Sequence, residues 1–168
     1  MVVTERVLKW MMCFYPPLLF QRIWITRFEK GFRGVHVKIN KSILNTNYND
    51  SIFGGTIFSA ADPFYPLLFH RILLTKGYDV RVWSKSSGIL FLKPGKTDLF
   101  FSIRISDEEI AEAEHILNTV GKYLKNYPID VFNISGEICV TLINEIYIRN
   151  LNFVDSGTRQ KNDAIYYE

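Results

Sequence analysis

A glycine pair and a single carboxylate in the segment 47–63 have the spacing of a site that polarises a bound group. Gly54 and Gly55 open a long apolar run. Glycines at the start of a helix let another molecule approach the backbone, and the first N–H groups of that helix have no partner within it. Asp62 lies seven residues after the second glycine, among apolar neighbours where a carboxylate is costly unless it is paired or used. We therefore predict a polarising amide site with a carboxylate about two helical turns away.

The helix that carries these residues is expected over 56–74, because this segment is apolar on nearly all sides. Such a helix belongs inside a structure, wrapped by other elements. Alternating apolar and polar residues predict strands, and these patterns occupy 32–40, 79–84, 89–92, 99–105 and the run from 128 to 151. A curved, mostly antiparallel sheet around one long central helix satisfies this order, and the fold class is α+β.

Two further helices are expected outside the sheet. The segment 17–31 starts with proline, repeats apolar residues at helical spacing and ends in Lys-Gly, which predicts an N-terminal cover helix. Ser106 and Glu109 form a capping box for an amphipathic helix that Lys122 and Lys125 are expected to end.

Length and charge set the broad limits. The 168 residues fit one domain, which we place over 1–151, followed by a polar tail over 152–168. With 48% apolar and 22% charged residues, the composition is that of a globular protein. The net charge of +3 is small and dispersed, so it does not indicate a nucleic-acid partner and suits an anionic small ligand equally well.

The cysteines and histidines indicate structural roles. Cys13 and Cys139 lie far apart without a Cys-x-x-Cys spacing, which favours buried free thiols in a reducing compartment and a cytoplasmic location. His36, His70 and His115 are equally dispersed. We therefore predict no metal site and no cofactor.

The apolar run 10–15 resembles the core of a signal peptide only in composition. Two prolines at 16 and 17 interrupt it, no small-residue cleavage site follows, and Arg22 comes too early for a membrane span. A membrane partner is therefore not expected, and peripheral membrane contact is kept as the lesser alternative.

The spacing of Asn47, Gly54-Gly55 and Asp62 resembles the active-site pattern of hotdog-fold thioesterases, above all the phenylacetate-pathway type. The wider pattern is similar to a hotdog branch catalogued as a domain of unknown function, which carries Phe-Gly-Gly and Ala-Asp-Pro. The resemblance covers roughly residues 15–150.

This resemblance implies a sheet wrapped around the helix, pairing into a homodimer or a dimer of dimers, and an acyl-CoA or acyl-carrier-protein thioester as substrate. An N–H of Gly54 or Gly55 would polarise the thioester carbonyl, as helix N-termini do for developing negative charge. Asp62 of the facing protomer would act as a base or nucleophile, and Asn47 would orient the water or the carbonyl. Four cations would meet the phosphates of CoA: Lys85, Lys93, Lys96 and Arg104. The favoured alternative is that these side chains are solvated at strand ends.

Two departures from the family pattern keep other readings open. Phe53 stands where family members often have His, and Pro63 directly follows Asp62. Asp62 would then be an ordinary N-cap of a helix starting at the proline, and Asn47 a turn former. These readings favour a non-catalytic hotdog protein that binds an acyl chain or a thioester. An acyl dehydratase on the same fold is a weaker third candidate, because no His accompanies the carboxylate in the motif.

Overall fold

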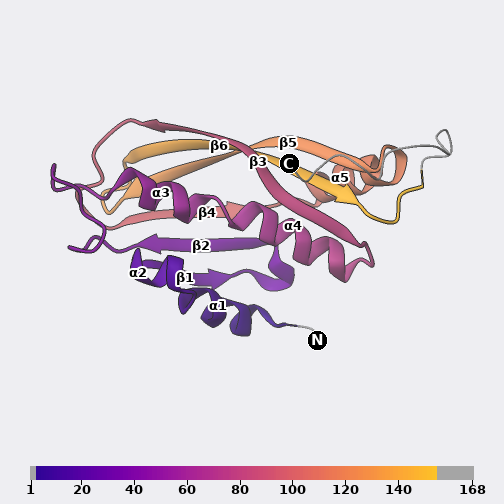
Figure 1. Cartoon of the computed structure of the whole chain (residues 1–168), viewed down its shortest axis with the longest axis horizontal. Coiled ribbons are helices and arrows are strands. Elements are labelled where there is room, and N and C mark those ends of the chain that lie inside the picture. The colour runs from indigo at the N-terminus through magenta and orange to yellow at the C-terminus, as the bar shows by residue number, and fades with distance from the viewer. Residues whose placement is uncertain (1–2, 155–168) are drawn as a thin grey trace, which may run out of the picture.

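One antiparallel sheet of six strands forms the body of the protein, in the order β1-β2-β4-β5-β6-β3 (Figure 1). The computed structural model describes residues 3–154. The strands are β1 (Ile23–Phe28), β2 (Gly34–Ile39), β3 (Val80–Phe91), β4 (Leu99–Arg104), β5 (Lys122–Asn133) and β6 (Ile138–Asn150). Strands β1 and β3 are the two edges, so within residues 3–154 each has one side without a partner strand.

A long kinked helix crosses one face of this curved sheet (Figure 1). The helices are α1 (Glu5–Cys13), α2 (Pro16–Phe20), α3 (Gly54–Ala61), α4 (Phe64–Thr75) and α5 (Asp107–Thr119), with a 3₁₀ turn at Lys30–Phe32. Because β2 and β3 lie in opposite halves of the sheet, α3 and α4 must span it. Their inward side chains, such as Phe64, Leu68 and Leu73, are fully buried. This is the hotdog fold expected from the sequence.

The central helix bends at Asp62–Pro63. Both residues keep helical backbone angles, with φ −62° and ψ −49° at Asp62 and φ −80° and ψ −18° at Pro63. No side chain caps the start of α4, so Asp62 is not the N-cap that the alternative reading supposed. Proline within a helix removes a hydrogen bond and bends the axis, which accounts for the position of the kink.

Two polar side chains of the sheet bind the carbonyls exposed at the kink. In an unbroken helix the Asp62 carbonyl would accept a hydrogen bond from the N–H of residue 66, but Pro66 has none. The Ser84 hydroxyl donates to this carbonyl instead, at 3.2 Å. Nδ2 of Asn144, a buried residue on β6, donates to the neighbouring Ala61 carbonyl, also at 3.2 Å. The sheet therefore supplies donors that the proline-containing helix lacks.

The expected N-terminal cover helix over 17–31 is wrong in its extent. Helix α2 ends at Phe20, and Ile23 to Phe28 forms the edge strand β1. Arg22 has φ +60°, a left-handed conformation that stops the helix. The apolar residues of this segment fit a helical period and a strand period equally well, and pairing with β2 decides between them. An additional N-terminal helix does cover the sheet, but it is α1, within the first fifteen residues.

The second half of the chain follows the predictions more closely. The capping box of α5 is confirmed, with the Ser106 N–H donating to Glu109 Oε2 at 2.8 Å and the Glu109 N–H to Ser106 Oγ at 3.1 Å. The helix ends earlier than expected, because Gly121 turns the chain with φ +79°. Lys122 and Lys125 therefore lie in β5 rather than at the helix end.

The segments expected as two strands over 79–84 and 89–92 form the single strand β3, with a register shift between Ser84 and Ser86. The expected C-terminal tail falls mostly on residues 155–168, which lie outside the described residues. The division into a domain over 1–151 and a tail stays a prediction.

Candidate active site

The first two N–H groups of α3 have no acceptor within residues 3–154. Phe53 is the N-cap, and its side chain makes no capping hydrogen bond. Its carbonyl accepts hydrogen bonds from the N–H groups of Thr56 at 2.9 Å and Ile57 at 3.3 Å. The N–H groups of Gly54 and Gly55 therefore remain available to a ligand, as expected for the first turn of a helix.

Aromatic side chains approach both glycines closely, and neither position needs glycine for its backbone conformation. A Cβ on Gly54 would lie 2.7 Å from Cζ of the Phe91 ring, and a Cβ on Gly55 would meet the ring of Phe53. Neither glycine has a positive φ. The two rings are more than half exposed and border the free amides. Within the described residues, the groups that lie against the two glycines are therefore aromatic rings.

Asn47 and Gly54 lie in one pocket of about 380 Å³, which we call the amide pocket. Oδ1 of Asn47 accepts from the N–H of Asn49 at 2.9 Å and from the N–H and hydroxyl of Ser51 at 3.2 and 3.1 Å. Asn47 is therefore a turn former, as the alternative reading held. Its Nδ2 donates to no residue of the described part of the chain, and this donor can face a ligand. The pocket is completed by Ser51, Ile52, Phe91, Leu92, Lys93, Pro94 and Gly95.

Three of the four cations considered for CoA phosphates already have acidic partners. Lys93 pairs with Glu137 at 2.6 Å, Arg104 with Glu29 at 2.8 Å, and Lys85 with Glu145 at 3.6 Å. The hydrogen bond from Lys93 also holds the pKa of the Glu137 carboxyl below its usual range. Lys96 is the remaining member, without an ion pair among the described residues. The main interactions of Lys85, Lys93 and Arg104 are therefore ion pairs on the protein surface.

Asp62 opens into a different pocket, which we call the carboxylate pocket. It measures about 390 Å³ and lies between the helix kink and the edge strand β3. The half-buried Asp62 carboxylate forms no ion pair or hydrogen bond with another side chain in residues 3–154. The other lining residues are Pro63, Pro66, Leu67, His70, Val82, Trp83 and Ser84.

His70 is a candidate residue that the sequence analysis assigned to a structural role. It lines the carboxylate pocket and is half-buried. Asp62, Pro66 and His70 recur every four residues, a spacing that places side chains on the same side of a helix. This four-residue spacing is the sequence signal that could have identified His70 as a candidate site residue. About 12 Å of helix rise separates Asp62 from His70, so the imidazole stands at the other end of the pocket.

The single chain does not unite the predicted site. The amide pocket and the carboxylate pocket share no lining residue. Asp62 lies seven positions after Gly55 along the helix, a rise of about 10 Å. Both pockets nevertheless border the edge strand β3, one through Phe91 near its end and the other through Ser84 near its start.

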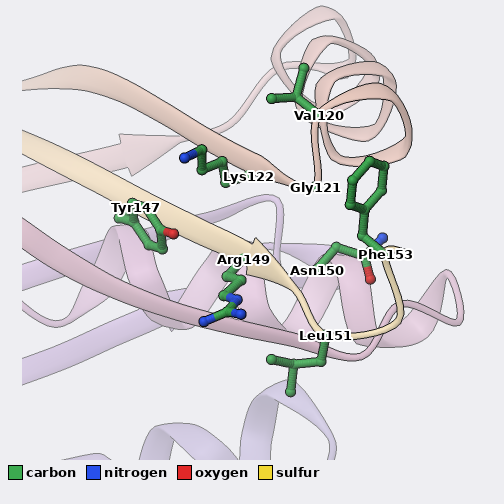
Figure 2. A pocket seen from close by; sticks show the side chains of 8 residues that line it. All are labelled: Val120, Gly121, Lys122, Tyr147, Arg149, Asn150, Leu151 and Phe153. Carbon is green, nitrogen blue, oxygen red and sulfur yellow. The ribbon is translucent and has the colours of Figure 1, made fainter. Parts of the chain in front are cut away.

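A third hollow, of about 410 Å³, contains none of the predicted site residues. Figure 2 shows Lys122, Tyr147 and Arg149 projecting from β5 and β6 on its wall. Lys122 and Arg149 face each other across the two strands. Among residues 3–154 no group of three or more His, Cys, Asp or Glu side chains is placed to hold a metal ion.

Solved structures with this fold include proteins described as thioesterases. PA5026 of Pseudomonas aeruginosa, a protein of unknown function and probable thioesterase, superposes with a TM-score of 0.74 at 17% identity, covering 89% of this chain and 98% of that one. The thioesterase HI1161 of Haemophilus influenzae superposes with a TM-score of 0.65 at 13% identity, covering 91% of this chain and 95% of that one. PaaI of the Escherichia coli phenylacetic acid degradation operon superposes with a TM-score of 0.58 at 15% identity, covering 84% of this chain and 88% of that one.

A search of curated protein sequences gave no match. The model of one family, described as "Domain of unknown function (DUF4442)", matches residues 4–148, which span the sheet and its helices from α1 to most of β6. The chain therefore belongs to the DUF4442 family, and it shares the hotdog fold of these solved structures.

Proposed function

We propose that the protein is a thioesterase that hydrolyses acyl-CoA or acyl-carrier-protein thioesters in a site shared by two copies of the chain. The observation that carries this proposal is the position of the two pockets at opposite ends of the edge strand β3. The thioesterases of the same fold support the reaction class.

Two-fold pairing of β3 would bring the pockets together. The ring of Phe91 packs on Gly54, and Ser84 is hydrogen-bonded to the Asp62 backbone. An antiparallel pair of β3 strands with Ser84 opposite Phe91 places the Gly54 end of one chain beside Asp62 of its partner. An edge strand offers unpaired backbone groups for such an interface, and a two-fold axis makes two equal sites.

The chemistry of the shared site follows from these groups. The free N–H groups of Gly54 and Gly55 donate to the thioester carbonyl oxygen, which gains negative charge as water attacks the carbon. One such donor contributes about 10²–10³ in rate. The partner's Asp62 accepts the proton of the attacking water, a step worth about 10²–10⁴. The C–S bond then breaks, and the protonated Asp62 returns this proton to the leaving sulfur, which gives the thiol and the carboxylic acid. Nδ2 of Asn47 orients the carbonyl or the water.

Thiol release tests this proposal. Purified protein is assayed with acyl-CoA thioesters of increasing chain length, beside the Asp62→Asn variant. We expect the variant to lose about 10²–10⁴ of kcat because it cannot accept the proton. Asp79→Asn, at an exposed carboxylate just before β3, is the matched control and should keep full activity. Equal activity of Asp62→Asn and the control would exclude the assigned role.

A non-catalytic acyl or thioester-binding protein is the second candidate. Phe53 favours it, because this ring lies against Gly55 at the position where the family motif often has His. Calorimetric titration with an acyl-CoA thioether, which cannot be hydrolysed, separates the two functions. Tight binding without turnover of the corresponding thioester at any chain length would establish the binding function instead.

Two buried free thiols, Cys13 and Cys139, support the further proposal that the protein works in the cytoplasm.

A further inference from the structure

Helix α1 has apolar side chains on two opposite faces. One face, with Leu8, Met12 and Cys13, packs on β1 and joins the core. The opposite face carries an apolar row at helical spacing that we call the outer stripe, formed by Val7, Trp10, Met11 and Phe14. These side chains are 47–62% exposed. Within the described residues 3–154 no other side chain covers the outer stripe, and an exposed apolar row of this kind marks an interaction surface.

Aromatic side chains dominate the exposed surface of this region. The rings of Trp10 and Phe14 stack with their centroids 5.9 Å apart. Beyond the helix, Tyr15 and Phe20 are exposed by 55% and 68%. Large aromatic rings at a wet surface are typical of segments that sit at a membrane–water interface.

Cations lie along one side of α1, next to the outer stripe. Lys9 Nζ lies 5.1 Å from the Trp10 ring centroid. A hollow of about 460 Å³ between α1 and β1 is lined by Arg6, Lys9, Arg27 and Lys30. None of these four forms an ion pair with a residue of the described range 3–154. The one acidic residue of the hollow, Glu5, accepts a hydrogen bond from the Gly31 N–H at 2.8 Å. The region is thus a positive surface beside an apolar one.

We propose that α1 docks on an anionic lipid bilayer through the outer stripe, with Trp10 and Phe14 at headgroup depth and the four cations against lipid phosphates. This combination of aromatic residues and cations is what binds helices in the plane of a membrane surface. A second copy of the chain fits less well, because two-fold pairing on this face would bring the unpaired cations of both copies together. No helix within residues 3–154 is long and apolar enough to span a membrane, so α1 lies on the surface. This inference does not depend on the proposed function.

Vesicle sedimentation tests the proposal with the full chain. We expect binding to vesicles of phosphatidylcholine with added phosphatidylglycerol, weak binding to phosphatidylcholine alone, and loss of binding at high salt because the charges are screened. The double variant Trp10→Ala/Phe14→Ala should bind at least about tenfold more weakly, from the apolar area lost. Arg6→Gln/Lys9→Gln should lose about fivefold for each cation removed.

The matched control is Leu124→Ala/Ile143→Ala, which removes two exposed apolar side chains from the outer side of the sheet and should bind as the unchanged protein does. Thermal unfolding confirms that each variant is folded, and the charge variant tests the surface without touching an apolar residue. Absence of binding to anionic vesicles would overturn the proposal, as would binding that both the stripe variant and the charge variant retain. Self-association that depends on Trp10 and Phe14 without vesicle binding would assign the stripe to a second copy instead.

Discussion

Gly54 serves the candidate site through its backbone. Its N–H has no acceptor in residues 3–154, and its Cα lies against the Phe91 ring. It is the first residue of α3, the position at which proline is best tolerated in a helix. Phe53 before it has an extended backbone, with φ −59° and ψ 133°, which a following proline allows. The N–H can therefore be removed while the helix start is kept.

Gly54→Pro removes this N–H, and Gly54→Ala is the matched control that keeps it while adding a Cβ at the same place. We expect Gly54→Pro to lose about 10²–10³ of kcat as an oxyanion donor is lost, and Gly54→Ala to lose much less. Because both added groups meet the Phe91 ring, the pair is repeated in a Phe91→Leu background. The measurement is thiol release with the melting temperature as a check on folding. Equal activity of the two variants would remove the N–H of Gly54 from the mechanism.

In Asn47, one side-chain atom has a structural role and the other is available to a ligand. Its Oδ1 holds the loop through three hydrogen bonds, and its Nδ2 is free within the described residues. Asn47→Asp keeps the acceptor and removes the donor, so we expect an unchanged melting temperature and a loss of about tenfold to a hundredfold in kcat/KM. Asn47→Ala should lower both quantities. If Asn47→Asp is fully active, the side chain is only a turn former.

The kinked helix shows which elements the sequence could reveal. Strand β2, strand β4 and the α5 cap were predicted because their patterns are local: period two in the strands and a capping box four residues long. The donors at the kink were not, since Ser84 and Asn144 lie 22 and 83 residues from the carbonyls they bind. The apolar spacing of β1 fits both a helical and a strand period, so the sequence predicts a helix there, and only the pairing with β2 resolves the ambiguity.

A double-mutant cycle tests the support of the kink by β3. Ser84→Ala leaves the Asp62 carbonyl without its donor, and we expect a loss of about 1–3 kcal/mol in the free energy of unfolding. In a Pro66→Ala background the N–H of residue 66 supplies a new donor, so the same substitution should have a smaller effect. Urea unfolding of the four proteins measures the difference. Equal effects of Ser84→Ala in both backgrounds would show that the serine does not replace the missing N–H.

An ion cluster at the ends of three strands makes stability depend on pH. Glu29 accepts hydrogen bonds from Arg104 Nε and Nη2 at 3.1 and 2.8 Å and lies 3.1 Å from His36 Nε2. The Arg104 hydrogen bond holds the pKa of the Glu29 carboxyl below its ordinary value of 4.5, with a further lowering by His36 and an opposing effect of burial. Because the folded-state pKa is lowered, this stabilisation is complete above the unfolded-state pKa and is lost as the pH falls through the folded-state pKa.

Glu29→Gln should therefore be less stable than the unchanged protein at neutral pH and lose less stability on acidification below about pH 4.5. Arg104→Gln, which removes the main partner, should flatten the pH dependence in the same direction. Melting temperatures from neutral to acidic pH provide the measurement. A Glu29→Gln curve parallel to that of the unchanged protein would mean that the cluster does not contribute to acid sensitivity.

The whole molecule presents an incomplete site along one open edge. The spacing of Gly55 and Asp62 predicts that both lie along one central helix, but spacing along a helix does not tell which groups face one another across an interface. The structure places Gly54 and Asp62 in separate pockets, bordered by Phe91 and Ser84 of the same edge strand. A reaction that uses both of these groups at once therefore requires a second copy of the chain. Without a second copy, the reaction must use a different set of residues.

Mixing two inactive variants distinguishes these possibilities. Gly54→Pro lacks the polarising N–H, and Asp62→Asn lacks the base, so homodimers of either should be nearly inactive. In a shared-site dimer each heterodimer regains one site with both native groups, because the two defects fall together in the other site. Subunit exchange at equal concentrations should restore about one intact site in four, and light scattering should report a dimer throughout. If each site lies within one chain, every chain in the mixture keeps its own defect, and thiol release will not rise above the sum of the two variants.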